Sequence, residues 1–130
     1  MQPIEVVNKY LDIVFSRNGD GLSDILAKDF VFDDPFTVAR SAEEFIAKSK
    51  SWAQAPKYLR MEKQFADGNH VCSIYTIEAM ALSGSAERFQ LADYMEVLRQ
   101  RISKERVYFF DQVAFTKAMG FKDEYLKKYS

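Results

Sequence analysis

Apolar residues recur at helical spacing in the N-terminal part of the chain and at every second position in the C-terminal part. Pro3 suits the first turn of a helix, and Tyr10 lies on the apolar stripe that follows it. Ser41 with Glu44 three residues later is a capping-box pattern. The predicted elements are helices over residues 3–17, within 21–30 and over about 42–53, and a short strand over 30–34.

The second half of the chain predicts four strands joined by short turns. The turns are DGNH at 67–70 and SGS at 83–85. Strands of the length expected here favour a strongly curved sheet. The expected strands are 58–66, 70–82, 86–101 and 105–115, and residues 121–130 resemble a short amphipathic tail. We therefore predict one α+β domain over residues 1–130, a curved antiparallel sheet whose helices pack into its concave face.

Composition limits the classes of partner. Hydrophobic residues make up 48% of the chain and aromatic residues 15%, which is typical of a globule with one core. The net charge is -1 and the pI is about 5.9, so the basic surface that nucleic acids or anionic membranes require is missing. We expect a small molecule, or another protein, as the partner.

Other features exclude several kinds of site. Cys72 has no second cysteine to pair with, and His70 is the only histidine, so we expect no disulfide and no structural zinc site. The N-terminus lacks the pattern of a signal peptide, and no segment has the apolar length of a membrane span. These features predict a cytoplasmic protein without a cofactor.

Asp93 is the polar residue that fits its surroundings least. Alternation along its strand puts it in one apolar row, with Phe89, Leu91, Met95 and Val97. A buried carboxylate without a partner costs several kcal/mol, so such a group takes up a proton or finds a donor. Asp93 is therefore a buried neutral acid that can donate a hydrogen bond, a buried acid satisfied by backbone groups, or an acid that a bulge turns to solvent.

Two more polar groups fall in apolar rows. Tyr10 needs a partner for its hydroxyl if its ring is buried, as any core tyrosine does. Asp34 should share a face with Phe30 and Phe32, but an acid before proline is also a common start of a turn. Asp33 is expected to face solvent.

Asp111 has two interpretations. Alternation places it on the face of Val107 and Phe109. It also precedes QVAFTKAMG, which ends in Gly120 as a helix would, and we favour a role as N-cap of a C-terminal helix.

In the order of these features the chain resembles the nuclear transport factor 2-like (NTF2-like) superfamily, in its SnoaL-like and ketosteroid isomerase-like branch. VVNKYLDIV resembles the first helix of the isomerases, FDDPF their strand with the general base, and QLADYMEV their strand with a protonated aspartic acid. The resemblance covers almost the whole chain. It implies a cone-shaped (cystatin-like) fold with a deep apolar pocket, and a homodimer paired through the sheet.

The resemblance also implies a mechanism. Asp34 would remove a proton beside a carbonyl, and Tyr10 and neutral Asp93 would donate hydrogen bonds to the enolate oxygen, the arrangement for which ketosteroid isomerase is the standard example. A small apolar molecule would be the substrate. The expected pocket walls are Phe32, Phe36, Phe45, Trp52, Leu91, Met95 and Phe109.

Some residues depart from this pattern and leave alternatives. Ile46 stands where the isomerases have a supporting tyrosine, and Leu91 where limonene epoxide hydrolases have an arginine. The C-terminal segment resembles SnoaL-type polyketide cyclases, in which Asp111 would be the base. A non-catalytic binding or dimerisation module is the other alternative, because the fold alone does not decide function.

Overall fold

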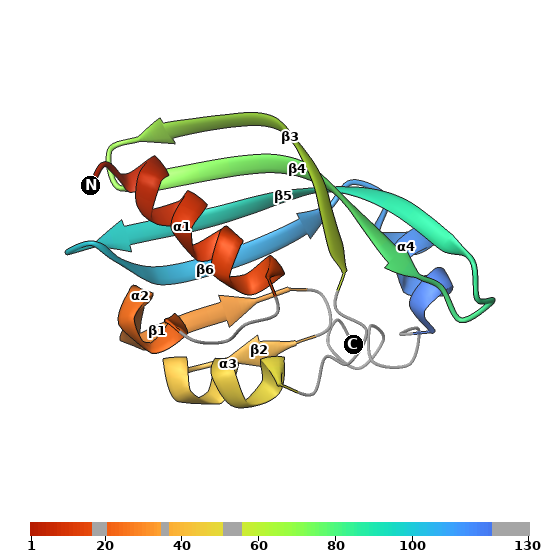
Figure 1. Cartoon of the computed structure of the whole chain (residues 1–130), viewed down its shortest axis with the longest axis horizontal. Helices are drawn as coiled ribbons and strands as arrows, with labels where there is room; N and C mark the ends of the chain where they lie inside the picture. Colours follow the sequence, from red (N-terminus) through yellow and green to blue (C-terminus); the bar gives the residue numbers. More distant parts are fainter. Residues whose placement is uncertain (17–20, 35–36, 51–55, 121–130) are drawn as a thin grey trace.

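The computed structural model describes residues 1–16, 21–34, 37–50 and 56–120. In these residues two helices, two strands and a third helix come first, four long strands follow, and a fourth helix comes last (Figure 1). The elements are α1 Pro3–Phe15, α2 Leu22–Ile25, β1 Leu26–Asp33, β2 Val38–Ala39, α3 Ala42–Ser49, β3 Lys57–Asp67, β4 His70–Met80, β5 Ala86–Leu98, β6 Arg101–Phe109 and α4 Gln112–Met119.

The described strands form one six-stranded sheet in the order β2-β1-β6-β5-β4-β3. The predicted meander is confirmed, because β3 to β6 pair with one another in sequence and antiparallel. Strand β1 adds to the far edge by pairing parallel to β6, and β2 folds back antiparallel on β1. Strands β4 and β5 bend along their length, so the sheet is curved as predicted (Figure 1).

Helix α1 packs against β3, β4, β5 and β6, and lies across their face (Figure 1). Its apolar stripe explains this placement, since Val6, Val7, Tyr10 and Leu11 are all buried. Helix α3 packs on β1 and β2, and brings Phe45 into the same core. The core therefore lies between the sheet and the N-terminal helices, as expected for this α+β domain.

Several boundaries differ from the prediction. The second helix has only the four residues of α2, and β1 begins at Leu26 instead of residue 30. Strand β5 ends at Leu98, because Arg99 and Gln100 take positive φ in a tight turn that starts β6 at Arg101. The predicted strand over 105–115 is wrong beyond Phe109, where α4 follows. Part of the expected helix 42–53 and the whole tail 121–130 lie outside the described residues.

Candidate functional site

Asp93 lies on the buried face of β5. Burial along this strand alternates as predicted, and the buried row contains Phe89, Leu91, Asp93, Met95 and Val97. The Asp93 side chain is 1% exposed, which excludes a bulge that turns it to solvent. The sequence prediction of a buried acid in an apolar row is therefore confirmed.

Two neighbours on the sheet lie diagonally beside Asp93. Asp93 is directly opposite Ser73 on β4 and Val107 on β6, so Tyr75 and Glu105 occupy the next inward positions, two residues along each strand. Diagonal neighbours in a sheet are within reach of long side chains. The Tyr75 hydroxyl donates to Asp93 Oδ2 at 2.6 Å. Asp93 Oδ1, by contrast, is buried and has no hydrogen-bond partner of ordinary geometry among the described residues.

Tyr10 reaches the same place from α1. Its hydroxyl donates to Glu105 Oε1 in a buried hydrogen bond. Its ring packs against Phe30 and Phe45, with centroids 6.5 Å apart in each case. The structure thus assembles four buried polar side chains from α1, β4, β5 and β6, which we call the carboxyl array: Tyr10, Tyr75, Asp93 and Glu105.

Burial governs the protonation of the two acids. Removal from water raises the pKa of Asp93 to about 6, against the lowering effect of hydrogen bonding to Glu105 and Tyr75. Burial, followed by the Asp93 charge, raises the pKa of Glu105 well above its ordinary value. The negative charge of Asp34 also raises the pKa of both acids. The carboxyl array therefore keeps a proton under conditions in which exposed acids are ionised.

The two tyrosines stay protonated. Burial raises the pKa of Tyr10 far above its ordinary value, and the Glu105 charge adds to this. Burial raises the pKa of Tyr75 in the same way, with the Asp93 charge as the next cause. Both hydroxyls are therefore hydrogen-bond donors, and neither can act as a base near neutral pH.

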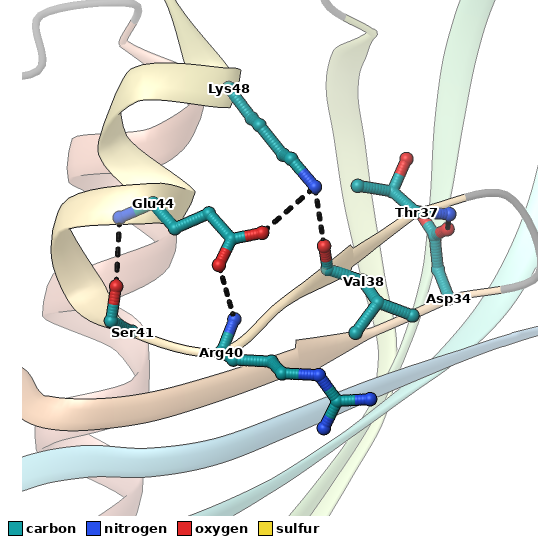
Figure 2. Close-up of polar contacts among 7 residues, drawn as sticks. All are labelled: Asp34, Thr37, Val38, Arg40, Ser41, Glu44 and Lys48. Atoms are coloured by element: carbon teal, nitrogen blue, oxygen red, sulfur yellow. Dashed lines mark hydrogen bonds and ion pairs between the residues drawn. The ribbon is translucent and has the colours of Figure 1, made fainter.

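Asp34 follows the end of β1 in the turn that leads to β2 (Figure 2). Its Oδ1 accepts a 2.6 Å hydrogen bond from the Thr37 backbone N–H, and its own N–H donates to the Thr37 carbonyl. The predicted turn interpretation is thus confirmed. The turn also orients the carboxylate, and its charge is felt by Asp93 and Glu105. Asp33 lies 3.9 Å from Arg106 at the partly exposed edge.

Helix α3 holds β2 in place (Figure 2). Ser41 Oγ accepts from the Glu44 N–H, so the predicted cap at Ser41 is confirmed. The reciprocal bond of a capping box differs, because Glu44 Oε2 accepts from the N–H of Arg40 and not of Ser41. Lys48 pairs with Glu44 at 3.0 Å and donates to the Val38 carbonyl at 2.6 Å. These bonds fasten β2 and the residue after it to the first and last turns of α3.

The expected pocket walls are only partly placed. Phe36 and Trp52 lie outside the described residues. The other five lie in or against the core, four of them buried and Phe109 half-buried: Phe32, Phe45, Leu91, Met95 and Phe109. Two hollows in the described surface lie elsewhere, one beside Arg60 and Phe89 and one between Lys28 and Arg101. Neither is lined by the carboxyl array, so the deep pocket stays a prediction.

The described residues offer no group of three His, Cys, Asp or Glu that could hold a metal ion. Within the same residues, no helix is long and apolar enough to cross a membrane.

Asp111 is exposed and caps α4, with Oδ1 accepting from the Ala114 N–H at 3.0 Å. The cap interpretation is confirmed. We therefore expect Asp111→Ala to lower the free energy of unfolding by about 1 kcal/mol, because the helix loses its cap, and Asp111→Asn to lower it much less. Chemical denaturation measures both. A loss of catalytic activity in the well-folded Asp111→Asn protein would instead favour Asp111 as the base.

Two members of the carboxyl array were missed in the sequence. Glu105 shares its alternation with Val107 and Phe109, so extending that row backwards would have found a second buried acid. Tyr75 shares its row with Val71, Ser73 and Ile77 on β4. The sequence does not distinguish Tyr75 from an ordinary core tyrosine, because only the register of β4 on β5 brings its hydroxyl to Asp93.

Solved structures identify the fold. An NTF2-like protein from Burkholderia xenovorans LB400 aligns with a TM-score of 0.78 and 15% identity over 90% of this chain and 95% of that one. An LEH-like epoxide hydrolase from M. tuberculosis aligns with a TM-score of 0.74 and 19% identity, over 89% of this chain and 88% of that one. A Kribbella flavida protein provisionally named a ketosteroid isomerase aligns with a TM-score of 0.69 and 15% identity, over 83% of this chain and 77% of that one. These likenesses show the NTF2-like fold and leave the activity open.

The sequence itself gives the family. A family model described as the SnoaL-like domain matches residues 7–105, a span from α1 to Glu105 in β6. The chain belongs to the SnoaL-like domain family, within the NTF2-like superfamily. No curated protein matches it.

Proposed function

We propose that this protein is a cofactor-independent enzyme that moves a proton beside the carbonyl of a small apolar compound. The observation that carries the proposal is Asp93 Oδ1, a buried carboxyl oxygen that lacks a hydrogen-bond partner among the described residues. A buried polar atom of this kind requires an explanation, and a ligand oxygen is one that fits. Perturbed acids in an apolar setting are typical of catalytic sites.

The carboxyl array supplies the oxygen-binding side of the proposed reaction. When protonated, Asp93 can donate from Oδ1 while Tyr75 holds Oδ2 at 2.6 Å. Tyr10 would be the second donor once its hydroxyl hydrogen, which Glu105 Oε1 accepts in the structure, turns toward the ligand oxygen. Donors fixed in a dry site stabilise the negative oxygen of an enolate far better than water-exposed donors do.

Asp34 supplies the base in this proposal. Its carboxylate is oriented by the Thr37 N–H and acts electrostatically on Asp93 and Glu105. It would take the proton from the carbon beside the carbonyl and return it to the product. Because a base and an acid on opposite sides of one carbonyl are sufficient for this chemistry, the proposal needs no cofactor.

The surroundings indicate the class of substrate. Phe32, Leu91 and Met95 are buried beside the carboxyl array's strands, and they offer only apolar surface. The proposed substrate is therefore a small ketone or enone without charged groups. An apolar compound also brings no competing polar group into the site.

An equilibrium titration with an ionised phenol, which mimics an enolate, tests this proposal. We expect wild type to bind it, Asp34→Asn to bind it as well or better because a nearby negative charge is removed, and Asp93→Ala to lose about 10- to 100-fold in affinity. Asp33→Asn is the matched control and should bind as wild type does. Equal binding by wild type and Asp93→Ala would contradict the proposal.

One observation favours a non-catalytic binding module. Phe45 packs on Phe30 and on Phe32 with centroids 5.2 and 5.0 Å apart, so aromatic rings fill the space beside Tyr10. If these rings do not move aside, the interior is a core and not a pocket. Absence of phenol binding in all the variants above would favour this alternative.

The predicted homodimer also remains a proposal, supported by the outer face of the sheet. Phe65, Tyr94 and Tyr108 are 49%, 39% and 47% exposed there, on β3, β5 and β6. The register joins Phe65, Cys72 and Tyr94 in one row across the sheet. Exposed aromatic surface of this kind often marks an interface. Sedimentation of the purified protein measures its mass, and a monomer at all concentrations would contradict the dimer.

A further inference from the structure

We propose that Asp93 and Glu105 share one proton in the free protein and take up a second from solvent when an enolate or phenolate oxygen binds at Asp93 Oδ1, with Glu105 as the positioning residue for Tyr10. The inference rests on the proposed function and deepens it. It assigns a role to Glu105 and names the ligand as an oxygen anion that arrives together with a proton.

The burial of both acids favours one proton on the pair, since Asp93 is 1% exposed and Glu105 is 5% exposed. Two tyrosine hydroxyls flank the pair, Tyr10 on Glu105 and Tyr75 on Asp93 Oδ2. The two carboxyls also interact with each other, in the sense that favours the proton on Glu105 and the charge on Asp93. In that state both tyrosine hydroxyls donate to a carboxyl, and the ionised Asp93 can only accept at Oδ1.

The charges around the two acids also favour the uptake of a proton with an anionic ligand. The groups that act on Asp93 and Glu105 are Tyr10 from α1, Asp34 after β1, Tyr75 from β4, and each other, and Cys72 on β4 feels the Asp93 charge. No cation forms an ion pair with either acid in the described part of the chain. An anionic ligand would therefore meet net negative charge unless a proton comes with it.

One added proton supplies the missing donor at Asp93 Oδ1 and offsets the negative charge of the ligand. A solvent proton added to Asp93 turns Oδ1 into a donor toward the ligand oxygen. Glu105 keeps its own proton and can donate it to the Tyr10 oxygen, which frees the Tyr10 hydrogen to point toward the same ligand oxygen. The sum is one ligand anion and one proton bound, with no other bond made or broken.

Infrared spectroscopy of the free protein tests the shared proton without any ligand. At about pH 7.5, wild type should show the carbonyl band of a protonated carboxyl, because exposed acids are ionised there. The double variant Asp93→Asn/Glu105→Gln should lack the band. Glu87→Gln removes an exposed acid from β5 and is the matched control that should keep it. Absence of the band in wild type would overturn the shared proton.

Calorimetry tests the uptake of the second proton. The probe is 3,4-dinitrophenolate, which is fully ionised at about pH 7.5, titrated in buffers that differ in their heats of ionisation. We expect wild type and Glu87→Gln to take up about one proton for each phenolate bound. Asp93→Asn should bind with no uptake, because its amide is a permanent donor.

The possible outcomes distinguish failure of this inference from failure of the proposed function. Phenolate binding by wild type without proton uptake would overturn the inference and leave the oxygen-binding site intact. Absence of binding would contradict the proposed function, and the uptake step with it, while the infrared band would still decide whether the two acids share a proton.

Discussion

Replacing Asp34 with asparagine is expected to slow proton exchange beside the carbonyl of a substrate by about 10²- to 10⁴-fold. The amide keeps the size of the side chain and can still accept from the Thr37 N–H, so the turn between β1 and β2 should persist. It cannot take up a proton. The measurement is the rate at which small apolar ketones and enones exchange hydrogen for deuterium in heavy water.

Asp33→Asn is the matched control for this experiment. Asp33 is the adjacent acid, but its Oδ2 lies 3.9 Å from Arg106 Nε at the partly exposed edge of the sheet. Its exchange rate should remain that of wild type. Equal losses in the two variants, or wild-type exchange in Asp34→Asn, would show that Asp34 is not the base.

Replacing Glu105 with glutamine is expected to change how stability depends on pH. The pKa of Glu105 in the folded state is raised, so between about pH 4.3 and that higher pKa the unfolded chain releases a proton that the folded protein keeps. Each such proton lowers the free energy of unfolding of wild type by about 1.4 kcal/mol per pH unit. Glutamine has no proton to lose, so the free energy of unfolding of the variant should rise relative to that of wild type as the pH rises.

Chemical denaturation at a series of pH values measures this difference. Asp93→Asn should behave similarly, but its gain should level off near pH 6, where Asp93 itself ionises in the folded protein. The control Glu87→Gln should run parallel to wild type. Parallel curves for Glu105→Gln and wild type would contradict a buried acid with a raised pKa.

Much of the fold could be predicted because its signals are local and repeated. The period-two rows of β4 and β5, the capping pattern at Ser41 and the N-cap at Asp111 all depend on nearby residues. The pairing of β1 parallel to β6 could not be predicted in this way, since it joins residues about 75 apart in the chain. The start of β1 at Leu26 was missed because LSDIL carries helical and strand signals together.

The candidate site shows the same division. Asp93 could be identified because one charged residue interrupts an apolar row, and Tyr10 because a hydroxyl falls on a helix stripe. Their partners depend on register: Tyr75 and Glu105 reach Asp93 only because Ser73 and Val107 are its direct neighbours. The sequence prediction joined Tyr10 to Asp93 in one oxygen site, whereas in the structure Glu105 accepts the hydrogen bond of Tyr10.

The central claim is that the carboxyl array binds the oxygen of an enolate, and a crystal structure of Asp34→Asn with a bound phenolate tests it most directly. We expect the phenolate oxygen to lie about 2.5–2.7 Å from Asp93 Oδ1 and within hydrogen-bonding distance of the Tyr10 hydroxyl. The aromatic rings of Phe32 and Phe45 would move to admit it. A phenolate bound in either surface hollow, with Tyr10 still donating to Glu105 and Asp93 Oδ1 still unpartnered, would contradict the claim.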